Sequence, residues 1–308
     1  MTFDVVIVGG GPAGLSAALL LGRARRRVLL VDGGARRNAA AEGIHGFVTR
    51  DGTPPNEFRR IGREQLQAYP SVEVRDGSVT AIEGERSAFQ VSLVATGGGP
   101  ARVAARRVLL CTGMIDDLPP IEGYAALWGK SIFQCPYCHG WEVQDRAFGI
   151  LVDRVELIEL AVMLRSWTKS VIALTNAGSP VPAEVRERLS AARVALDERR
   201  IRRLVANGEH LQRVEFDAGE PLRLDALFAR PPQRQVALVQ TLGLTLDEAG
   251  YVRIDDKLWE TSRPGIFAAG DLVTPVQSAI LSAAAGARAM AMINHGLTSE
   301  LATSGLLD

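Results

Sequence analysis

The chain has 308 residues, a length that favours two domains, and 47% of them are hydrophobic and 23% charged, which is enough apolar material for a sizeable core. Lys plus Arg and Asp plus Glu both number 35, so the net charge is zero and nothing global attracts nucleic acid or anionic membrane. No run approaches the roughly 18 apolar residues of a membrane span, and no secretory signal is visible. We therefore expect a cytoplasmic protein without nucleic-acid or membrane partners.

A βαβ unit opens the chain. Residues 3–9 form an apolar, β-branched run without helical period, which predicts a buried parallel strand. Residues 12–22 are rich in Ala and Leu and predict a helix, and residues 27–32 predict a second strand.

A second α/β pattern follows a linker. After a strand expected at 108–112, the stretch 113–123 contains Pro119 and Pro120, which break regular structure. The further elements that we predict are a strand at 148–152, a helix at 155–167, a strand at 170–175, a break at Pro231 and Pro232, a strand at 265–269 and a long Ala-rich helix at 276–294.

The simplest interpretation is two nucleotide-binding patterns, the second inserted into the first. We predict the α/β class with two Rossmann-like (three-layer ββα) domains. The first comprises 1–115 plus 241–308, and the inserted domain comprises 116–240.

The segment GGGPAG carries a dinucleotide fingerprint, Gly-x-Gly-x-x-Gly, between a strand and a helix. Gly9 allows the tight turn, Gly11 lets the backbone approach a pyrophosphate, and Gly14 lets helix and strand pack closely. Pro12 and Ala13 begin the helix, whose N-terminal N–H groups favour phosphate. The alternative is a glycine-rich turn in an α/β protein that binds no nucleotide.

Two acidic residues extend this predicted site. Asp32 ends the second strand, where a carboxylate can accept from both ribose hydroxyls of an adenosine and would repel a 2′-phosphate. Gly270 and Asp271 follow the strand at 265–269; Gly270 permits close approach to a ligand, and we expect Asp271 to cap the long helix and face the cofactor.

Cys135-Pro-Tyr-Cys138 lies just after the linker, and His139 follows directly. Two intervening residues bring the thiols close enough to form a disulfide, and such pairs often have one thiol of lowered pKa. His139 can exchange the thiol proton. The third cysteine, Cys111, lies in an apolar strand and is expected to be an inert core residue.

Other interpretations of the cysteine motif are weaker. A zinc site needs four ligands, but there is no second cysteine pair and the remaining histidines, His45, His210 and His295, are scattered. Cys-x-x-Cys-His is also the attachment pattern of c-type haem, which usually requires export. A purely structural pair is the third alternative. We predict no metal site.

Together, GGGPAG, Asp32, VLLCTG, CPYCHG and GIFAAGD resemble the low-molecular-weight thioredoxin reductases over nearly the whole chain. The CPYCHGWE version looks especially like the gliotoxin- and holomycin-type dithiol oxidase branch. The resemblance implies a homodimer with FAD in the outer domain, where Gly113 and Gln277 join the cofactor-binding residues. It also implies that Cys138 is nearest the flavin and Cys135 attacks the partner, with His139 as the acid–base group.

One stretch departs from the reductase pattern. Where a reductase has a second glycine fingerprint for NADPH, this chain has Val152, Asp153 and Arg154, whose side chains would crowd a pyrophosphate. The next predicted strand ends in Thr175-Asn-Ala, without a basic cluster for a 2′-phosphate. We expect NADPH binding to be lost, with weak binding in another mode as the alternative.

Three hypotheses follow. The first is a dithiol oxidase that oxidises a small dithiol or a peptide through Cys135, Cys138 and FAD, with oxygen as acceptor. The second is a disulfide reductase that is fed by ferredoxin or NADPH and acts on a thioredoxin-like protein. The third is a non-catalytic FAD-bound redox sensor.

Overall fold

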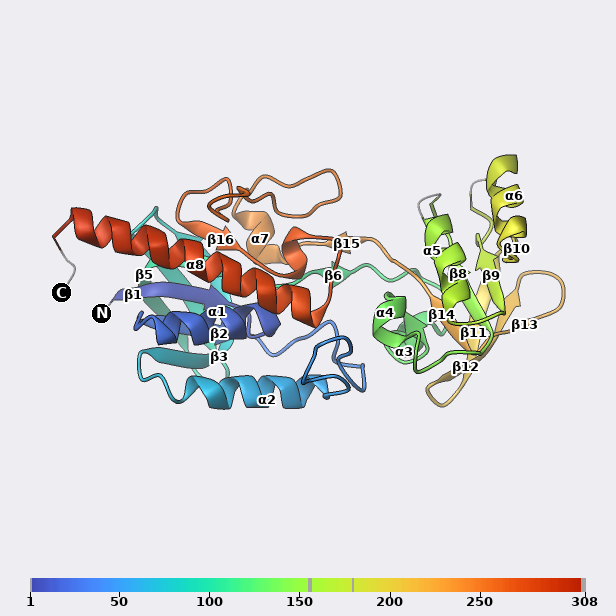
Figure 1. Ribbon diagram of the computed structural model, residues 1–308, viewed down its shortest axis with the longest axis horizontal. Helices are drawn as coiled ribbons and strands as arrows, with labels where there is room; N and C mark the ends of the chain where they lie inside the picture. The colour runs from blue at the N-terminus through green and yellow to red at the C-terminus, as the bar shows by residue number, and fades with distance from the viewer. Residues whose placement is uncertain (1, 155–156, 179, 306–308) are drawn as a thin grey trace. The chain divides into compact units, whose positions relative to one another are not determined.

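The computed structural model describes residues 2–154, 157–178 and 180–305, which divide into two compact units (Figure 1). The first unit contains Met1–Ala39, Phe47–Ile115 and Gln233–Asp308, and the second contains Ala40–Gly46 and Asp116–Pro232. The second boundary therefore follows Pro232, whereas the sequence placed it at 240–241. The short segment Ala40–Gly46 was expected in the first unit; it packs with the second.

The first unit is a parallel sheet with helices on one face and a meander on the other. Its elements are β1 (Thr2–Val8), α1 (Pro12–Arg23), β2 (Val28–Asp32), α2 (Pro55–Leu66), β3 (Val72–Glu83), β4 (Phe89–Ala95), β5 (Pro100–Leu110), α7 (Ala237–Thr241), β16 (Ile266–Ala268), η3 (Asp271–Val273) and α8 (Ala279–Thr303). β2, β1, β5 and β16 run parallel, while β3, β4 and β5 form the antiparallel meander. Strand β3 belongs to both layers, because its first half pairs with β2 and its second half with β4.

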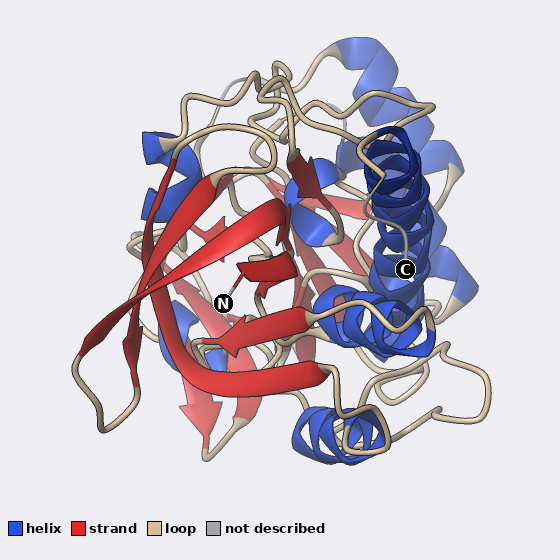
Figure 2. Ribbon diagram, turned by 90° about the vertical axis from the view of Figure 1, so that its left-hand side faces the viewer, coloured by secondary structure: helices blue, strands red, loops and turns tan. Residues whose placement is uncertain are grey.

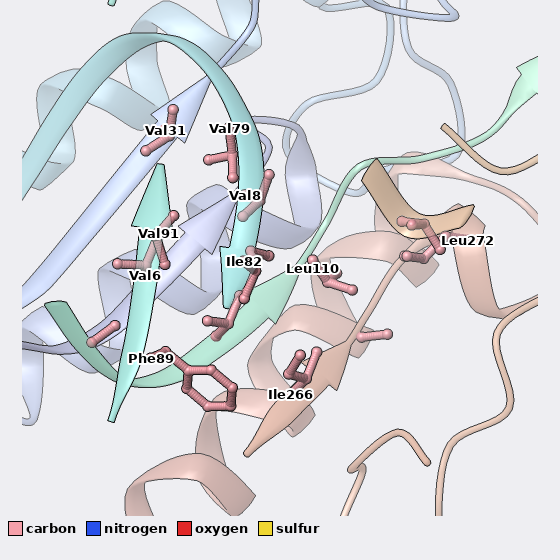
Figure 3. Packing of buried hydrophobic residues seen from close by; sticks show 14 of the residues in the cluster. Val6, Val8, Val31, Val79, Ile82, Phe89, Val91, Leu110, Ile266 and Leu272 are labelled. Atoms are coloured by element: carbon pink, nitrogen blue, oxygen red, sulfur yellow. The ribbon is translucent and has the colours of Figure 1, made fainter. Parts of the chain in front are cut away.

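Alternating side chains of β1 separate the two cores of this unit. Val6 and Val8 face the meander, where they pack in one cluster with Phe89 of β4 (Figure 3). Val5 and Ile7 face the other way and pack against α1 and α8, which lie side by side (Figure 1). The layers are thus meander, sheet and helices, the predicted ββα order.

The second unit repeats this plan on a smaller scale. Its elements are α3 (Tyr124–Leu127), β7 (Ile132–Phe133), α4 (Pro136–His139), β8 (Phe148–Leu151), α5 (Ile158–Met163), η2 (Leu164–Ser166), β9 (Val171–Leu174), α6 (Ala183–Ala191), β10 (Ala195–Asp197), β11 (Ile201–Asn207), β12 (His210–Phe216), β13 (Leu222–Arg223) and β14 (Ala226–Phe228). A parallel sheet in the order β10-β9-β8-β14-β7 accompanies the β11-β12-β13 meander. The chain passes between the units through β6 (Ile115–Asp116) and β15 (Gln233–Arg234).

The mixture of strands and helices in Figure 2 confirms the predicted α/β class. The predicted boundaries of helices and strands differ from the structure more than the predicted types do. The helix expected at 155–167 is divided into α5, which runs from Ile158 to Met163, and the 3-10 helix η2, which ends at Ser166. Residues 155 and 156 of the expected helix lie outside the described ranges. Within those ranges, none of the helices has the length and apolar character that crossing a membrane requires.

The prediction that Asp271 caps the long helix was wrong. Asp271 begins the short helix η3, and α8 starts eight residues later, at Ala279. The cap of α8 is Ser278, whose hydroxyl oxygen accepts from the backbone N–H of Leu281 at 3.3 Å. The sequence pattern could not separate the two helices, because Asp271 and Ser278 are both favourable N-cap residues.

Candidate functional site: a nucleotide cradle and a redox-active thiol pair

The fingerprint turn joins β1 to α1, and its three glycines meet different surroundings. Gly9 has a φ of +114°, and a Cβ there would lie 2.2 Å from the carbonyl oxygen of Cys111. A Cβ on Gly14 would lie 1.9 Å from the carbonyl oxygen of Gly9, so this glycine is needed for helix–strand packing. A Cβ on Gly11 would meet no described atom within 4 Å. The turn thus leaves space in front of the N-terminus of α1, as a pyrophosphate requires.

Other predicted cofactor residues lie around this turn at the carboxyl ends of the parallel strands. A Cβ added to Gly10 would lie 2.2 Å from a carboxylate oxygen of Asp32, at the end of β2. One added to Gly270, which follows β16 with a φ of +93°, would lie 3.1 Å from the Cβ of Ala13. Gly113 follows β5 with a φ of +65°. In parallel α/β sheets this edge is where ligands bind.

Asp32 is buried and already paired. Its carboxylate accepts from the backbone N–H of Gly34 at 3.0 Å and forms ion pairs with Arg59 and with Arg63, the latter at 2.9 Å. Burial alone would raise the pKa of Asp32, but these N–H and guanidinium groups hold it below its usual value. The carboxylate is therefore ionised, and the two arginines offset the repulsion of phosphate that the sequence led us to expect.

Asp271 and Gln277 are brought together by an arginine that the sequence analysis did not single out. Arg37 donates to Asp271 Oδ2 at 3.0 Å and to Gln277 Oε1 at 2.6 Å. Asp271 Oδ1 also accepts from the hydroxyl of Ser282 on α8, at 2.8 Å. Asp271 thus touches α8 through Ser282 while its other oxygen faces Arg37, and both predicted cofactor residues sit in one hydrogen-bonded cluster.

The cysteine pair lies at the short helix α4 of the second unit. The sulfur atoms of Cys135 and Cys138 lie 2.6 Å apart, and the Cys138 thiol donates a hydrogen bond to Cys135. This hydrogen bond, helped by backbone N–H groups and the charge of Arg230, lowers the pKa of Cys135 to about 7 despite its burial. This lowered pKa gives Cys135 a substantial thiolate fraction at neutral pH, which makes it a good nucleophile. Cys111, in contrast, is buried in the first unit, and burial raises its pKa.

His139 follows Cys138 and is held in a largely apolar setting. Its ring stacks on Phe133 of β7, with ring centroids 4.5 Å apart. Burial, with a smaller contribution from the charge of His45, lowers the pKa of His139 to about 4. The ring is therefore neutral at pH 7, where it can accept a thiol proton but holds none to donate as an imidazolium.

The turn between β8 and α5 differs from the fingerprint turn of the first unit. Val152 carries a buried side chain where the first turn has Gly9, although the N–H groups of both residues donate to the neighbouring strand at 2.8 Å, to the carbonyls of Leu174 and Val31 respectively. Arg154 donates to the carbonyl oxygen of Arg230 at 2.9 Å and lies 3.6 Å from the carboxylate of Asp153. Val152, Asp153 and Arg154 thus stand at positions where a nucleotide-binding turn has glycines.

Sequence reasoning missed several residues at these sites. Arg59 and Arg63 lie on α2, Arg37 follows β2, and His45 comes from the segment that packs with the second unit. None belongs to a local motif. The run Arg36-Arg37 directly after the predicted ribose-binding strand was a usable signal for Arg37, whereas the others become visible through tertiary contacts.

A glycine turn with space for a phosphate on one unit and a close thiol pair on the other are the features expected of disulfide oxidoreductases that work with a flavin. The chain belongs to the family described as "Pyridine nucleotide-disulphide oxidoreductase", which it matches over residues 3–291. This family implies a flavin cofactor and nucleotide binding, and the protein is a disulfide oxidoreductase enzyme.

Individual relatives agree with this assignment. "Thioredoxin reductase tcpT" of Claviceps purpurea is 32% identical over 281 residues, which cover 87% of this chain and 86% of the relative. The solved "oxidoreductase from Agrobacterium tumefaciens" is 36% identical with a TM-score of 0.89, covering 97% of this chain and 99% of its own. The structure of HlmI is 35% identical with a TM-score of 0.89, covering 99% and 95%. The predicted resemblance to thioredoxin reductases and the two Rossmann-type domains are confirmed.

Proposed function

We propose that this protein is an FAD-dependent dithiol oxidase, which converts a substrate dithiol into a disulfide with oxygen as acceptor and without NADPH. The observation that carries the proposal is a contrast within the second unit. This unit has a thiol of lowered pKa at Cys135, yet Val152, Asp153 and Arg154 stand where a nucleotide-binding turn has glycines. In this proposal the thiol pair therefore exchanges electrons with a substrate dithiol and with FAD, and not with NADPH.

The first unit offers the cradle that FAD needs. The open space at Gly11 fits the pyrophosphate, the carboxylate of Asp32 fits the ribose, and Gly113, Gly270, Asp271 and Gln277 complete the proposed site. The chemistry that bound FAD would supply is to take two electrons from the dithiol pair and pass them to oxygen, which gives hydrogen peroxide.

The oxidised cysteine pair would react with substrate by exchange. A substrate thiolate attacks Sγ of Cys135; the new sulfur–sulfur bond forms as the Cys135–Cys138 bond breaks, and the electron pair stays on Cys138. The second substrate thiolate then attacks its own mixed disulfide, which releases Cys135 and forms the product disulfide. His139, neutral at pH 7, accepts the proton that the attacking thiol loses.

Aerobic turnover with dithiothreitol tests this proposal. Purified protein should consume oxygen, produce hydrogen peroxide in equimolar amount to the oxidised dithiol, and need no added nucleotide. Cys135→Ser and Cys138→Ser should each abolish this turnover. Oxidation that proceeds unchanged in both variants would show that free flavin, not the cysteine pair, carries the reaction and would overturn the proposal.

A further inference from the structure

Arg37 joins two segments that carry proposed FAD-binding residues. It follows β2, whereas Asp271 begins η3 and Gln277 lies in the loop before α8. A single nitrogen of Arg37, Nη1, donates to Asp271 Oδ2 at 3.0 Å and to Gln277 Oε1 at 2.6 Å. The ion pair is partly shielded from water, because the side chains of Arg37 and Asp271 are only 22% and 24% exposed. One cation thus makes both contacts, and its loss affects both segments.

Asp271 stands beside the turn that is proposed to hold the pyrophosphate. It follows Gly270, where an added Cβ would lie 3.1 Å from the Cβ of Ala13 in the first turn of α1. Its second carboxylate oxygen, Oδ1, accepts from the hydroxyl of Ser282 at 2.8 Å. A carboxylate without a cation in this place would repel a negatively charged pyrophosphate. The charge of Arg37 offsets that repulsion.

The side-chain amide of Gln277 has protein partners at both its atoms. Its Nε2 donates to Gln233 Oε1 at 2.9 Å and to the carbonyl of Asp271 at 3.2 Å. Its Oε1 accepts from Arg37 and from Gln233 Nε2, the latter at 3.2 Å. Gln233 is held in turn by the hydroxyl of Tyr251, which donates to Gln233 Oε1 at 3.0 Å. Gln277 therefore contributes to the site by fixing the loop before α8, and Arg37 is one of the groups that hold it.

The other carboxylate of the cradle is balanced in the same way. Asp32 is paired with Arg59 and Arg63, which lie on α2 and not on the fingerprint turn. Both carboxylates beside the glycine turn thus have arginine partners from other segments of the chain. Offsetting their charge lets acidic side chains stand next to an anionic cofactor without a large electrostatic penalty.

We propose that Arg37 is a positioning residue of the FAD site, which sets the affinity for FAD by neutralising Asp271 and fixing Gln277. The inference rests on the proposed function in that it takes FAD as the cofactor, and it holds for either direction of electron flow. It also gives Asp271 a definite role: a carboxylate that binds the cofactor only together with its arginine.

The dissociation constant of FAD tests the inference, measured from the change in flavin fluorescence as the purified holoprotein is diluted. Arg37→Met should bind FAD about 10-fold or more weakly, because it leaves the Asp271 carboxylate without its cation. Arg37→Lys keeps the charge and should recover part of the affinity. Arg253→Met, at an exposed position of the same unit, serves as control and should bind FAD as wild type does. Should Arg37→Met not fold, Arg37→Gln, which keeps a donor without the charge, takes its place.

A double-mutant cycle separates an electrostatic role from a packing role. Asp271→Asn removes the charge that Arg37 balances, so adding it to Arg37→Met should restore part of the lost affinity. Higher salt should also narrow the gap between Arg37→Met and wild type, because it screens the repulsion between the carboxylate and the phosphates. A lost packing contact would respond to neither change.

Unchanged FAD binding in Arg37→Met would overturn the inference. Weakened binding that Arg37→Lys, Asp271→Asn and salt all leave unrestored would do the same and make Arg37 a packing residue. Oxygen consumption with dithiothreitol, measured on the same wild-type sample, keeps the proposed function apart. If the affinities change as expected but wild type does not oxidise the dithiol, the proposed function fails and the inference stands. If wild type oxidises the dithiol while Arg37→Met binds FAD normally, the reverse holds, and wild type that binds no FAD would overturn both.

Discussion

The two strand–turn–helix segments, β1–α1 and β8–α5, begin alike and diverge at the turn. In the first, Gly11 leaves open space before the helix, and a buried carboxylate, Asp32, lies beside the turn. In the second, Val152 is buried and Arg154 is tied to the carbonyl of Arg230. The comparison teaches that a strand–turn–helix segment keeps its fold when side chains replace the glycines of the turn, because the sheet and its cores do not depend on clearance there.

The largest effects are expected from two glycines of the first turn, one needed for folding and the other for binding FAD. Gly14→Ala places a Cβ against the Gly9 carbonyl, so it should destabilise the protein by about 3 kcal/mol or more through forced backbone movement. Gly11→Val has room in the protein itself and should fold, but it should lose bound FAD because its side chain occupies the pyrophosphate space. Denaturation curves and flavin absorbance distinguish the two. A stable, yellow Gly11→Val protein would remove the cradle argument.

The next largest effect concerns the different roles proposed for Cys135 and Cys138. Cys138→Ala removes the hydrogen bond that stabilises the Cys135 thiolate, so the pKa of Cys135 should rise from about 7 towards the ordinary thiol value. Alkylation of Cys135 by iodoacetamide, followed against pH, measures this rise. Cys135→Ser should instead leave Cys138 able to give a long-wavelength charge-transfer band with oxidised flavin. A charge-transfer band in the Cys138 variant instead would mean that Cys135, and not Cys138, lies nearest the flavin.

A smaller effect should appear in stability against acid. The pKa of His139 is lowered to about 4, so the folded state loses stability as pH falls below about 6.5, where the unfolded ring takes up a proton. This loss approaches about 3 kcal/mol once pH lies below both pKa values. His139→Leu removes the ionisable ring and should show a shallower decline in urea denaturation between these pH values; the exposed His210→Leu should decline as wild type does. A wild-type slope in His139→Leu would contradict the burial argument.

The smallest effect belongs to Arg230. Its charge contributes to the lowered pKa of Cys135, but less than the hydrogen bond from Cys138. Arg230→Gln should therefore raise the alkylation midpoint of Cys135 by less than Cys138→Ala does, and the shift should shrink at high salt. Arg223→Gln, an exposed position on β13, serves as control. A larger shift in Arg230→Gln than in Cys138→Ala would reverse the order of these causes.

The sequence predicted those features that are encoded locally. Glycine spacing between an apolar strand and an Ala-rich helix identified the cradle, and the spacing of Cys135 and Cys138 identified the thiol pair. The partners of these groups were not predictable, because Arg59, Arg63 and His45 reach them through tertiary packing. The misplaced cap of α8 has the same origin: whether Asp271 or Ser278 starts a helix depends on the contacts of η3 with its surroundings.

The difference between the two turns is tested most directly by anaerobic flavin reduction. Separate cuvettes of the purified yellow protein receive stoichiometric dithiothreitol, NADPH or NADH, and flavin absorbance is followed. The account predicts that the dithiol bleaches the flavin and that air restores the colour with formation of peroxide. It also predicts that neither nucleotide bleaches the flavin at a useful rate, because Val152, Asp153 and Arg154 occupy the second turn. Bleaching by stoichiometric NADPH within seconds would contradict the account and make the protein an ordinary NADPH-dependent reductase.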